Sequence, residues 1–151
     1  MAKKQNTKIG TETSYKKFLN QIDLYALGLD SISADIKREP YAAAHADESS
    51  EIVREIKSHF KLIEFGEGYF DVSASFTLRI KIRDEEDLLF IRASFTAHFH
   101  SRDLPQIEEH ANRFAQSEAR LIFWPYFRQL VADTTARMHI RPITIPISLK
   151  P

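Results

Sequence analysis

Three histidines are the residues in this sequence whose type and spacing best fit metal binding or acid–base chemistry. His98 and His100 form a His-x-His pair, and His110 follows further along the chain. If the pair lies on one strand, both side chains share a face, and the two rings can chelate a metal ion. A catalytic zinc site also needs a third ligand and groups that orient the ligands, and the spacing shows neither. We therefore interpret the pair as polar residues on the solvent face of a strand, and we predict no metal site and no cofactor.

Carboxylates and nucleophiles give no better evidence of an active site. Glu108, Glu109 and Glu118 fit the solvated face of a helix. The acidic run 84–87 fits the tip of a hairpin, with a docking point for a basic partner as the alternative. The sequence has no cysteine, no glycine-rich phosphate loop and no serine nucleophile motif. We therefore expect a protein that is not an enzyme.

Net charge and hydropathy exclude several classes of protein. The chain has 21 Lys and Arg against 21 Asp and Glu, so it lacks the basic surplus that phosphate contacts require, and we expect no nucleic acid partner. Its polar start lacks the apolar stretch of a signal peptide. The longest apolar run, 121–127, is far shorter than the roughly 20 residues that span a bilayer. We expect a cytoplasmic protein without membrane insertion.

Alternation of apolar and polar residues is the clearest structural pattern. From Phe70 to Arg83 every even position is apolar and every odd position is polar, which predicts a half-buried strand. After the acidic run, every odd position from Leu89 to Phe99 is apolar. The two segments therefore predict a long antiparallel hairpin.

The first third of the chain is harder to interpret. We expect 1–11 to be a disordered tail and 12–151 to form a single domain. The spacing of the apolar residues changes phase in this region, which predicts a short helix from Thr11 followed by a strand to Ile36 with a bulge near Gly28. A helix that continues to Leu29 is the competing interpretation. Residues 40–50 are small and polar and predict a crossover loop. Residues 51–60 fit a strand or a short helix equally well.

A helix pair is predicted near the C-terminus. Residues 103–106 resemble a capping box with a proline in the first turn, and an apolar stripe runs from Phe123 to Met138. Pro125 requires that this helix start near Ser117–Leu121 or that it kink. The proline-rich segment 142–149 should lie extended along a sheet edge or over the core. Strands followed by helices favour an α+β domain, with an antiparallel sheet and helices packed on one face.

Aromatic residues are unusually frequent, with 11 Phe, 5 Tyr and 1 Trp. Phe123, Trp124, Tyr126 and Phe127 cover nearly all sides of one helical turn, and a helix that is apolar all round must be buried on both sides. Three interpretations stay open: a thick monomeric core, self-association, and self-association together with a groove for apolar ligands.

The C-terminal third resembles a known family. The run Leu-Ile-Phe-Trp-Pro-Tyr-Phe-Arg at 121–128, followed by a helix and by Pro-Ile-Thr-Ile-Pro at 142–146, is similar to the hallmark of SecB-type export chaperones. The order of strand, crossover, hairpin and helix also resembles that family. The resemblance implies a four-stranded antiparallel sheet with a long C-terminal helix pair, assembled as a dimer of dimers (a homotetramer). It further implies an ATP-independent holdase that binds unfolded polypeptides in apolar grooves, for export or to protect a specific antitoxin.

The resemblance also implies where clients bind. Phe60, Phe65 and Tyr69 fall in the region that lines the family's groove, and Trp124 and Tyr126 fall on its helix motif. Together with other aromatic residues that are hard to bury, they form a predicted client-binding set: Phe60, Phe65, Tyr69, Phe90, Phe123, Trp124, Tyr126 and Phe127.

One departure from the family concerns its partner SecA, the translocase ATPase. The family's docking surface for SecA is acidic, whereas Arg92 stands at the position that we align with a key glutamate, and Asp30 keeps one acidic position on the first strand. Asp30 and Arg92 mark the possible translocase-docking site, and SecA is left open as a partner.

Two other function classes stay open. The order of sheet and helices, with His98 and His100, also fits a hotdog-like acyl-thioester hydrolase or a binder of small apolar ligands. A purely structural module that associates with itself is the third hypothesis.

Overall fold

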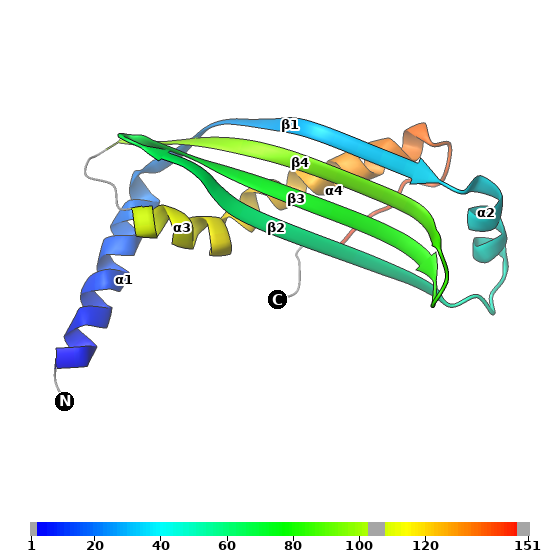
Figure 1. Cartoon of the computed structure of the whole chain (residues 1–151), viewed down its shortest axis with the longest axis horizontal. Coiled ribbons are helices and arrows are strands. Elements are labelled where there is room, and N and C mark those ends of the chain that lie inside the picture. The colour runs from blue at the N-terminus through cyan, green and yellow to red at the C-terminus, as the bar shows by residue number, and fades with distance from the viewer. Residues whose placement is uncertain (1–2, 103–107, 148–151) are drawn as a thin grey trace.

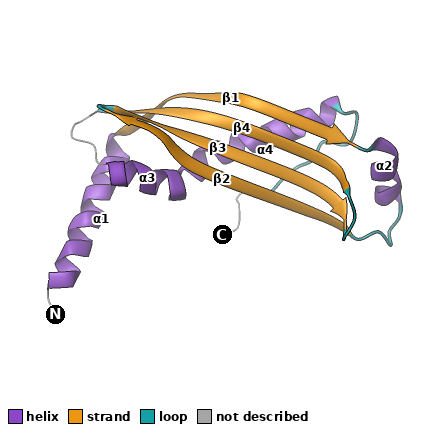
Figure 2. Cartoon of the chain, viewed as in Figure 1, coloured by secondary structure: helices purple, strands orange, loops and turns teal. Residues whose placement is uncertain are grey.

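The computed structural model describes residues 3–102 and 108–147. Within these ranges the chain forms four strands and four helices: α1 (Lys3–Gln21), β1 (Ile22–Ile36), α2 (Arg38–Ala46), β2 (Ile52–Gly66), β3 (Tyr69–Ile82), β4 (Asp87–Ser101), α3 (Glu108–Ser117) and α4 (Ala119–Arg137). The strands form one curved layer, and α3 and α4 lie behind it on one face (Figures 1 and 2). The predicted α+β class, with a four-stranded antiparallel sheet and a C-terminal helix pair on one face, is confirmed.

The sheet has the strand order β1-β4-β3-β2, and each neighbouring pair is antiparallel. The predicted hairpin of β3 and β4 is correct, with Phe70 opposite Phe99 and Leu78 opposite Ile91. The even positions of β3 and the odd positions of β4 are buried under the helices. We call this helix-covered side the inner face of the sheet, and the opposite side its outer face.

Strand β1 runs along one edge of the sheet and contains two bulges. Its register against β4 shifts between Leu24 and Ala26 and again between Leu29 and Ser31. The second shift confirms the bulge expected near Gly28, and the competing helix is wrong. Each bulge inserts one residue, so apolar residues that are not evenly spaced in the sequence still lie on the same face.

Residues 40–50 were expected to form a crossover loop, and this prediction is wrong for most of the segment. Helix α2 occupies Arg38–Ala46. Alanine has the highest helix propensity, and the sequence Tyr-Ala-Ala-Ala follows Pro40 directly. Pro40 lies in the first turn, where a missing N–H breaks no helical hydrogen bond. Residues 51–60, which fitted either state, belong to strand β2.

The N-terminal helix begins earlier than expected. Helix α1 starts at Lys3 rather than near Thr11, and it passes into β1 without a loop. The capping-box prediction at 103–106 and the last residues of the predicted extended segment lie outside the described residues.

Helix α4 packs against the central strands β3 and β4. The ring of Phe127 stacks on Phe76 with centroids 4.5 Å apart, and Phe123 lies 6.2 Å from Phe60. The helix starts at Ala119, within the predicted range, and Pro125 is accommodated in its interior. Pro125 cannot donate to the carbonyl of Leu121, but Leu121 is on the exposed side of the helix, where water can reach that turn.

The segment that follows α4 folds back as an extended strap over the helix. Ile143 and Ile145 are buried, while Thr144 and Pro146 between and beyond them are exposed. The indole N–H of Trp124 donates to the carbonyl of Pro146 at 2.8 Å. For the described residues 142–147, the prediction of an extended segment over the core is confirmed.

Candidate functional site

The structure buries three of the aromatic residues that we predicted to bind a client. Phe123 and Phe127 are fully buried and Trp124 is 4% exposed within one copy of the chain. We inferred that this helical turn must be buried on both sides and that a second subunit could provide one of them. The sheet covers one side, and the strap of the same chain, with Ile143 and Ile145, covers part of the other. These three rings therefore form core within one copy of the chain, and none of them is exposed there.

The other five predicted residues do not form one surface. Phe60 and Phe65 are half-buried on the inner face of β2, whereas Tyr69 is at the start of β3 on the outer face. Phe90 also lies on the outer face, between the guanidinium groups of Arg79 and Arg92 at 5.5 and 5.4 Å. Tyr126, 48% exposed, lies on α4.

A continuous apolar surface does exist, but along β1. Leu24, Leu27, Leu29 and Ile32 pair with Phe99, Ala97, Phe95 and Ala93 of β4, which places all four on the inner face. Their β4 partners are buried, yet Leu24, Leu29 and Ile32 are 41%, 46% and 43% exposed. We call these four residues the β1 apolar row. The helices that cover the central strands leave this row accessible.

The free edge of β1 is also unusual in its charge. Edge strands are commonly protected from pairing with other chains by charged residues, especially lysine, by proline, by β-bulges or by a covering element. Strand β2, at the other edge, carries Arg54, Lys57 and Lys61, whereas β1 contains three aspartates and no Lys, Arg or Pro. An accessible apolar face and an edge without basic residues therefore occur on the same strand.

The sequence pattern by itself does not reveal the β1 apolar row. Leu24, Leu27, Leu29 and Ile32 are unevenly spaced in the sequence. A period of two therefore does not place them on one face unless both bulges are known. The exposure of the row depends on the strand order, because only an edge strand escapes the cover of α4. Neither property is visible in the hydropathy pattern alone.

The three histidines do not meet. His98 pairs with Asp71 on the outer face, with 2.8 Å between Nδ1 and Oδ1. His100 stacks on Tyr25, with centroids 4.4 Å apart. His110 is buried between α1 and α3, where its Nε2 lies 2.9 Å from the hydroxyl of Ser14. Among the described residues no group of three or more His, Asp or Glu could hold a metal ion.

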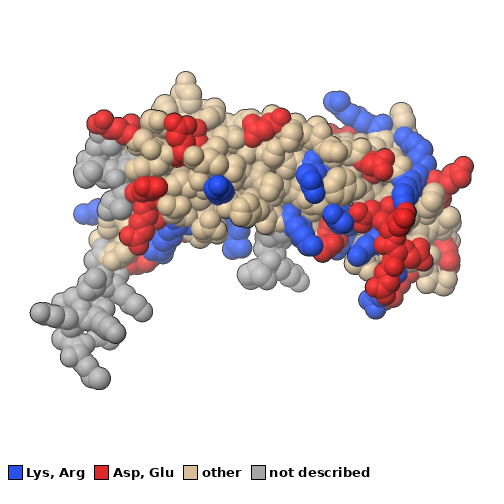
Figure 3. Space-filling model, viewed as in Figure 1, with Lys and Arg blue, Asp and Glu red and all other residues tan. Residues whose placement is uncertain are grey.

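The acidic hairpin tip is partly neutralised by the chain itself. Glu86 pairs with Lys37, and Asp87 lies 3.3 Å from Arg79. Figure 3 shows acidic side chains gathered at the end of the molecule that carries this tip and α2. The two residues of the possible translocase-docking site both lie toward the outer face. Asp30 accepts a hydrogen bond from Thr96 at 2.7 Å, and Arg92 covers Phe90.

Comparison with known proteins identifies the fold. No protein-family model and no curated protein matches the sequence. Among solved structures, the Rv1957 SecB-like chaperone of Mycobacterium tuberculosis, in complex with a ChAD peptide from the Rv1956 HigA1 antitoxin, superposes with a TM-score of 0.72. It is 20% identical, and the match covers 88% of this chain and 95% of that one. The fold is that of a SecB-like chaperone.

The fold that the helix motif and the proline-rich segment implied by their resemblance is therefore confirmed. A second structure, of a protein of unknown function from Streptococcus agalactiae, matches with a TM-score of 0.47 and 9% identity over 83% of this chain and 97% of that one. None of the helices in the described part of the chain is both long and apolar enough to cross a membrane.

Proposed function

We propose that this protein is an ATP-independent holdase, which binds unfolded polypeptides along the β1 apolar row. The observation that supports the proposal is the exposure of Leu24, Leu29 and Ile32 on the inner face of an edge strand. A holdase needs apolar contact area without sequence readout, and an exposed sheet edge lets an extended peptide add a strand through backbone hydrogen bonds.

The geometry of β1 suits an extended client. From Leu24 to Ile32 the strand contains two bulges and lies opposite residues 93–99 of β4. This length is about 20 Å at about 3.3 Å per residue, enough for a client segment of about seven residues. A client strand paired with β1 would place alternate side chains on the inner face, beside the row. The polar or charged residues between them would face outward, near Asp23, Asp30 and Asp35.

We propose an antitoxin or an export preprotein as the client, held in the cytoplasm before it folds. The structure of Rv1957 contains a peptide from an antitoxin, which favours a dedicated antitoxin client. Docking to SecA has less support. The outer face carries the guanidinium groups of Arg79 and Arg92 around Phe90, where the resemblance implies an acidic surface.

We also propose that copies of the chain associate, as the dimer of dimers that the resemblance implies. Leu121 and Tyr126 are 68% and 48% exposed on α4, so this helix presents apolar side chains away from its own sheet. Light scattering of Leu121→Asp should show a smaller assembly than the unsubstituted protein. A monomer in both samples would contradict self-association.

An enzymatic function is not supported by the arrangement of the histidines. His98 and Asp71 pair on the outer face, while His110 is buried in the contact between α1 and α3. Hydrolysis of acyl thioesters that is lost in His98→Ala would reverse this conclusion.

The test of the holdase proposal compares two faces of one strand. Ile32→Asp places a carboxylate in the β1 apolar row, whereas Ser33→Asp places the same group one residue further on, on the outer face opposite Arg92. We expect Ile32→Asp to weaken suppression of aggregation of a reduced, unfolded client by about tenfold, and Ser33→Asp to leave it unchanged. Equal suppression by both variants, with both folded by circular dichroism, would contradict the proposal.

A further inference from the structure

The C-terminal part of α1 covers an aromatic cluster at one end of the sheet. Tyr15 and Phe18, three residues apart on the helix, are 2% and 4% exposed. The ring of Phe18 lies 5.7 Å from Phe70 and 6.5 Å from Phe114. The two side chains of α1 therefore anchor the helix on rings that belong to β3 and α3.

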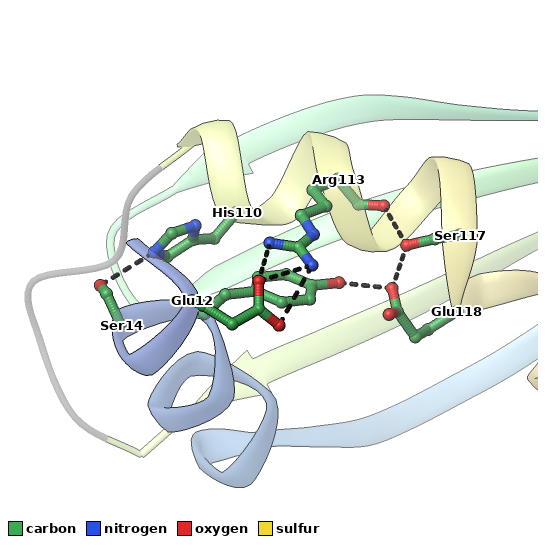
Figure 4. Close-up of polar contacts among 7 residues, drawn as sticks. Glu12, Ser14, His110, Arg113, Ser117 and Glu118 are labelled. Atoms are coloured by element: carbon green, nitrogen blue, oxygen red, sulfur yellow. Dashed lines mark hydrogen bonds and ion pairs between the residues drawn. The ribbon is translucent and has the colours of Figure 1, made fainter. Parts of the chain in front are cut away.

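Polar contacts surround this anchor (Figure 4). Arg113 of α3 pairs with Glu12 at 3.1 Å, and its guanidinium lies 3.8 Å from the ring centroid of Tyr15. The hydroxyl of Tyr15 donates to Glu118. Ser14 and His110 add one more hydrogen bond at 2.9 Å. The Glu12–Arg113 pair is half-exposed, and pairs of this kind contribute little stability.

The contacts described above attach the C-terminal part of α1 to the body. The rest of the helix projects away from the sheet (Figure 1). An isolated helix of this length is marginal in water and depends on packing for its stability. The attachment includes two rings that are almost fully buried, with Leu19 packed against the same core, so a segment that displaces α1 has to replace this apolar burial.

The surface beneath α1 continues the β1 apolar row. Phe70 stacks on Phe99 and Phe99 packs edge-on against Phe114, both with centroids 5.0 Å apart. Leu24, the first residue of the row, pairs with Phe99 on the same face. We call Phe70, Phe99 and Phe114 the aromatic platform. Release of α1 would extend the accessible apolar surface from the row onto these rings.

We propose that the aromatic platform is a second binding site, which α1 occupies at rest and a client segment occupies after α1 is released. The occupant is a segment with two aromatic residues three positions apart, because Tyr15 and Phe18 fill the site with that spacing. This inference rests on the proposed holdase function, since it extends the client surface of the β1 apolar row.

The test opens α1 in the full-length protein by reversing one charge. Glu12→Arg places a second cation beside Arg113. The double variant Glu12→Arg with Arg113→Glu restores a pair of opposite charges. The control, Glu67→Arg, makes the same charge reversal in the exposed turn between β2 and β3. Hydrogen exchange of residues 14–20 measures the release of α1. We expect faster exchange in Glu12→Arg and no change in Glu67→Arg. In the double variant the slow exchange should return only in part, because residue 113 no longer stacks on Tyr15.

Binding is then measured with a labelled 12-residue peptide that contains two phenylalanines three positions apart, and with a matched peptide that has serines instead. The apparent affinity rises with the fraction of molecules in the open state. We expect the phenylalanine peptide to bind Glu12→Arg about fivefold more tightly than the unsubstituted protein or Glu67→Arg. A benzophenone at one phenylalanine should crosslink to the segments that contain Phe70, Phe99 and Phe114.

Several results would overturn the inference. One such result is an equal affinity of the phenylalanine peptide for all variants, although hydrogen exchange shows that α1 is released. Another is crosslinking of the peptide to residues 24–32 alone. A larger assembly of Glu12→Arg without peptide would assign the platform to a second copy instead. If hydrogen exchange shows that Glu12→Arg does not release α1, the experiment is repeated with Phe18→Ala, which removes one of the two anchoring rings. An unchanged affinity for the phenylalanine peptide in Phe18→Ala would also contradict the inference. Failure of the unsubstituted protein to suppress aggregation would contradict the holdase proposal, while peptide crosslinking to the platform would still support this site.

Discussion

The indole N–H of Trp124 donates a hydrogen bond of 2.8 Å to the carbonyl of Pro146, and so ties helix α4 to the strap that runs along it. Trp124→Phe keeps an aromatic ring and removes the donor. We expect the free energy of unfolding to fall by about 1–2 kcal/mol, because the Pro146 carbonyl loses its partner and a smaller ring leaves space. Urea denaturation measures the change. Tyr126→Phe, on the exposed side of the same helix, should change it by less than about 0.5 kcal/mol.

Thr135 holds the other end of the strap. Its buried hydroxyl donates to the carbonyl of Val131 at 2.8 Å and accepts from the backbone N–H of Ile143 at 3.0 Å. Thr135→Val keeps the shape but leaves the buried N–H of Ile143 unpaired, which should cost about 1–3 kcal/mol. Thr135→Ser retains the hydroxyl and should lose less. Equal losses in the two variants, measured by thermal unfolding, would show that the hydrogen bond is unimportant.

The stack of Phe76 on Phe127 lies at the centre of the core, with the ring planes inclined by 11°. Phe76→Ala removes a fully buried ring between the sheet and α4, and we expect a loss of about 3–5 kcal/mol from the lost burial and the cavity. Ile147→Ala, at a residue 82% exposed, should be nearly neutral. Calorimetry of both variants measures the difference, and a similar melting temperature for the two would contradict this description of the core.

Tyr15 should make the attachment of α1 sensitive to alkaline pH. Burial, with the acceptor Glu118 as a second cause, raises the pKa of Tyr15 from 10.0 to about 12. The unfolded chain loses this proton near pH 10, whereas the folded chain keeps it until about pH 12. The resulting stability is complete below pH 10 and is lost between pH 10 and 12, by about 2 kcal/mol in total.

Tyr15→Phe isolates this effect, because it removes the titrating group and keeps the ring. The difference in unfolding free energy between the two proteins should be constant up to pH 9.5 and should decrease from there to pH 11.5. A difference independent of pH would mean that the hydroxyl of Tyr15 is accessible to water in the folded state.

Much of the fold follows from local patterns in the sequence. The alternation around Phe76 and Phe95 defines the hairpin, because a period of two places one face of each strand in the core. Helix α2 was missed because small residues fit both helices and loops, and only the alanine run distinguishes them. The helix motif and the proline-rich segment indicated the SecB-like fold, since their order along the chain is specific.

The aromatic set predicted to bind a client could not be divided into buried and exposed residues from the sequence, for a physical reason. Aromatic side chains such as Phe123 and Phe127 are favoured both in cores and at binding surfaces, and composition does not distinguish the two. Whether a ring is exposed depends on which elements cover it, here the strap with Ile143 and Ile145. The exposure of Leu29 depends in turn on the strand order, which is a non-local property.

The strand order has a consequence for synthesis on the ribosome. β1 pairs with β4 rather than with β2, so the first strand to emerge has no partner until the segment Asp87–Ser101 has been translated. During that interval both edges of β1 and its row of leucines are available to any nascent chain nearby. A chain with the proposed holdase function would therefore itself pass through a stage at which it can aggregate. Slower translation before residue 87 would lengthen that stage.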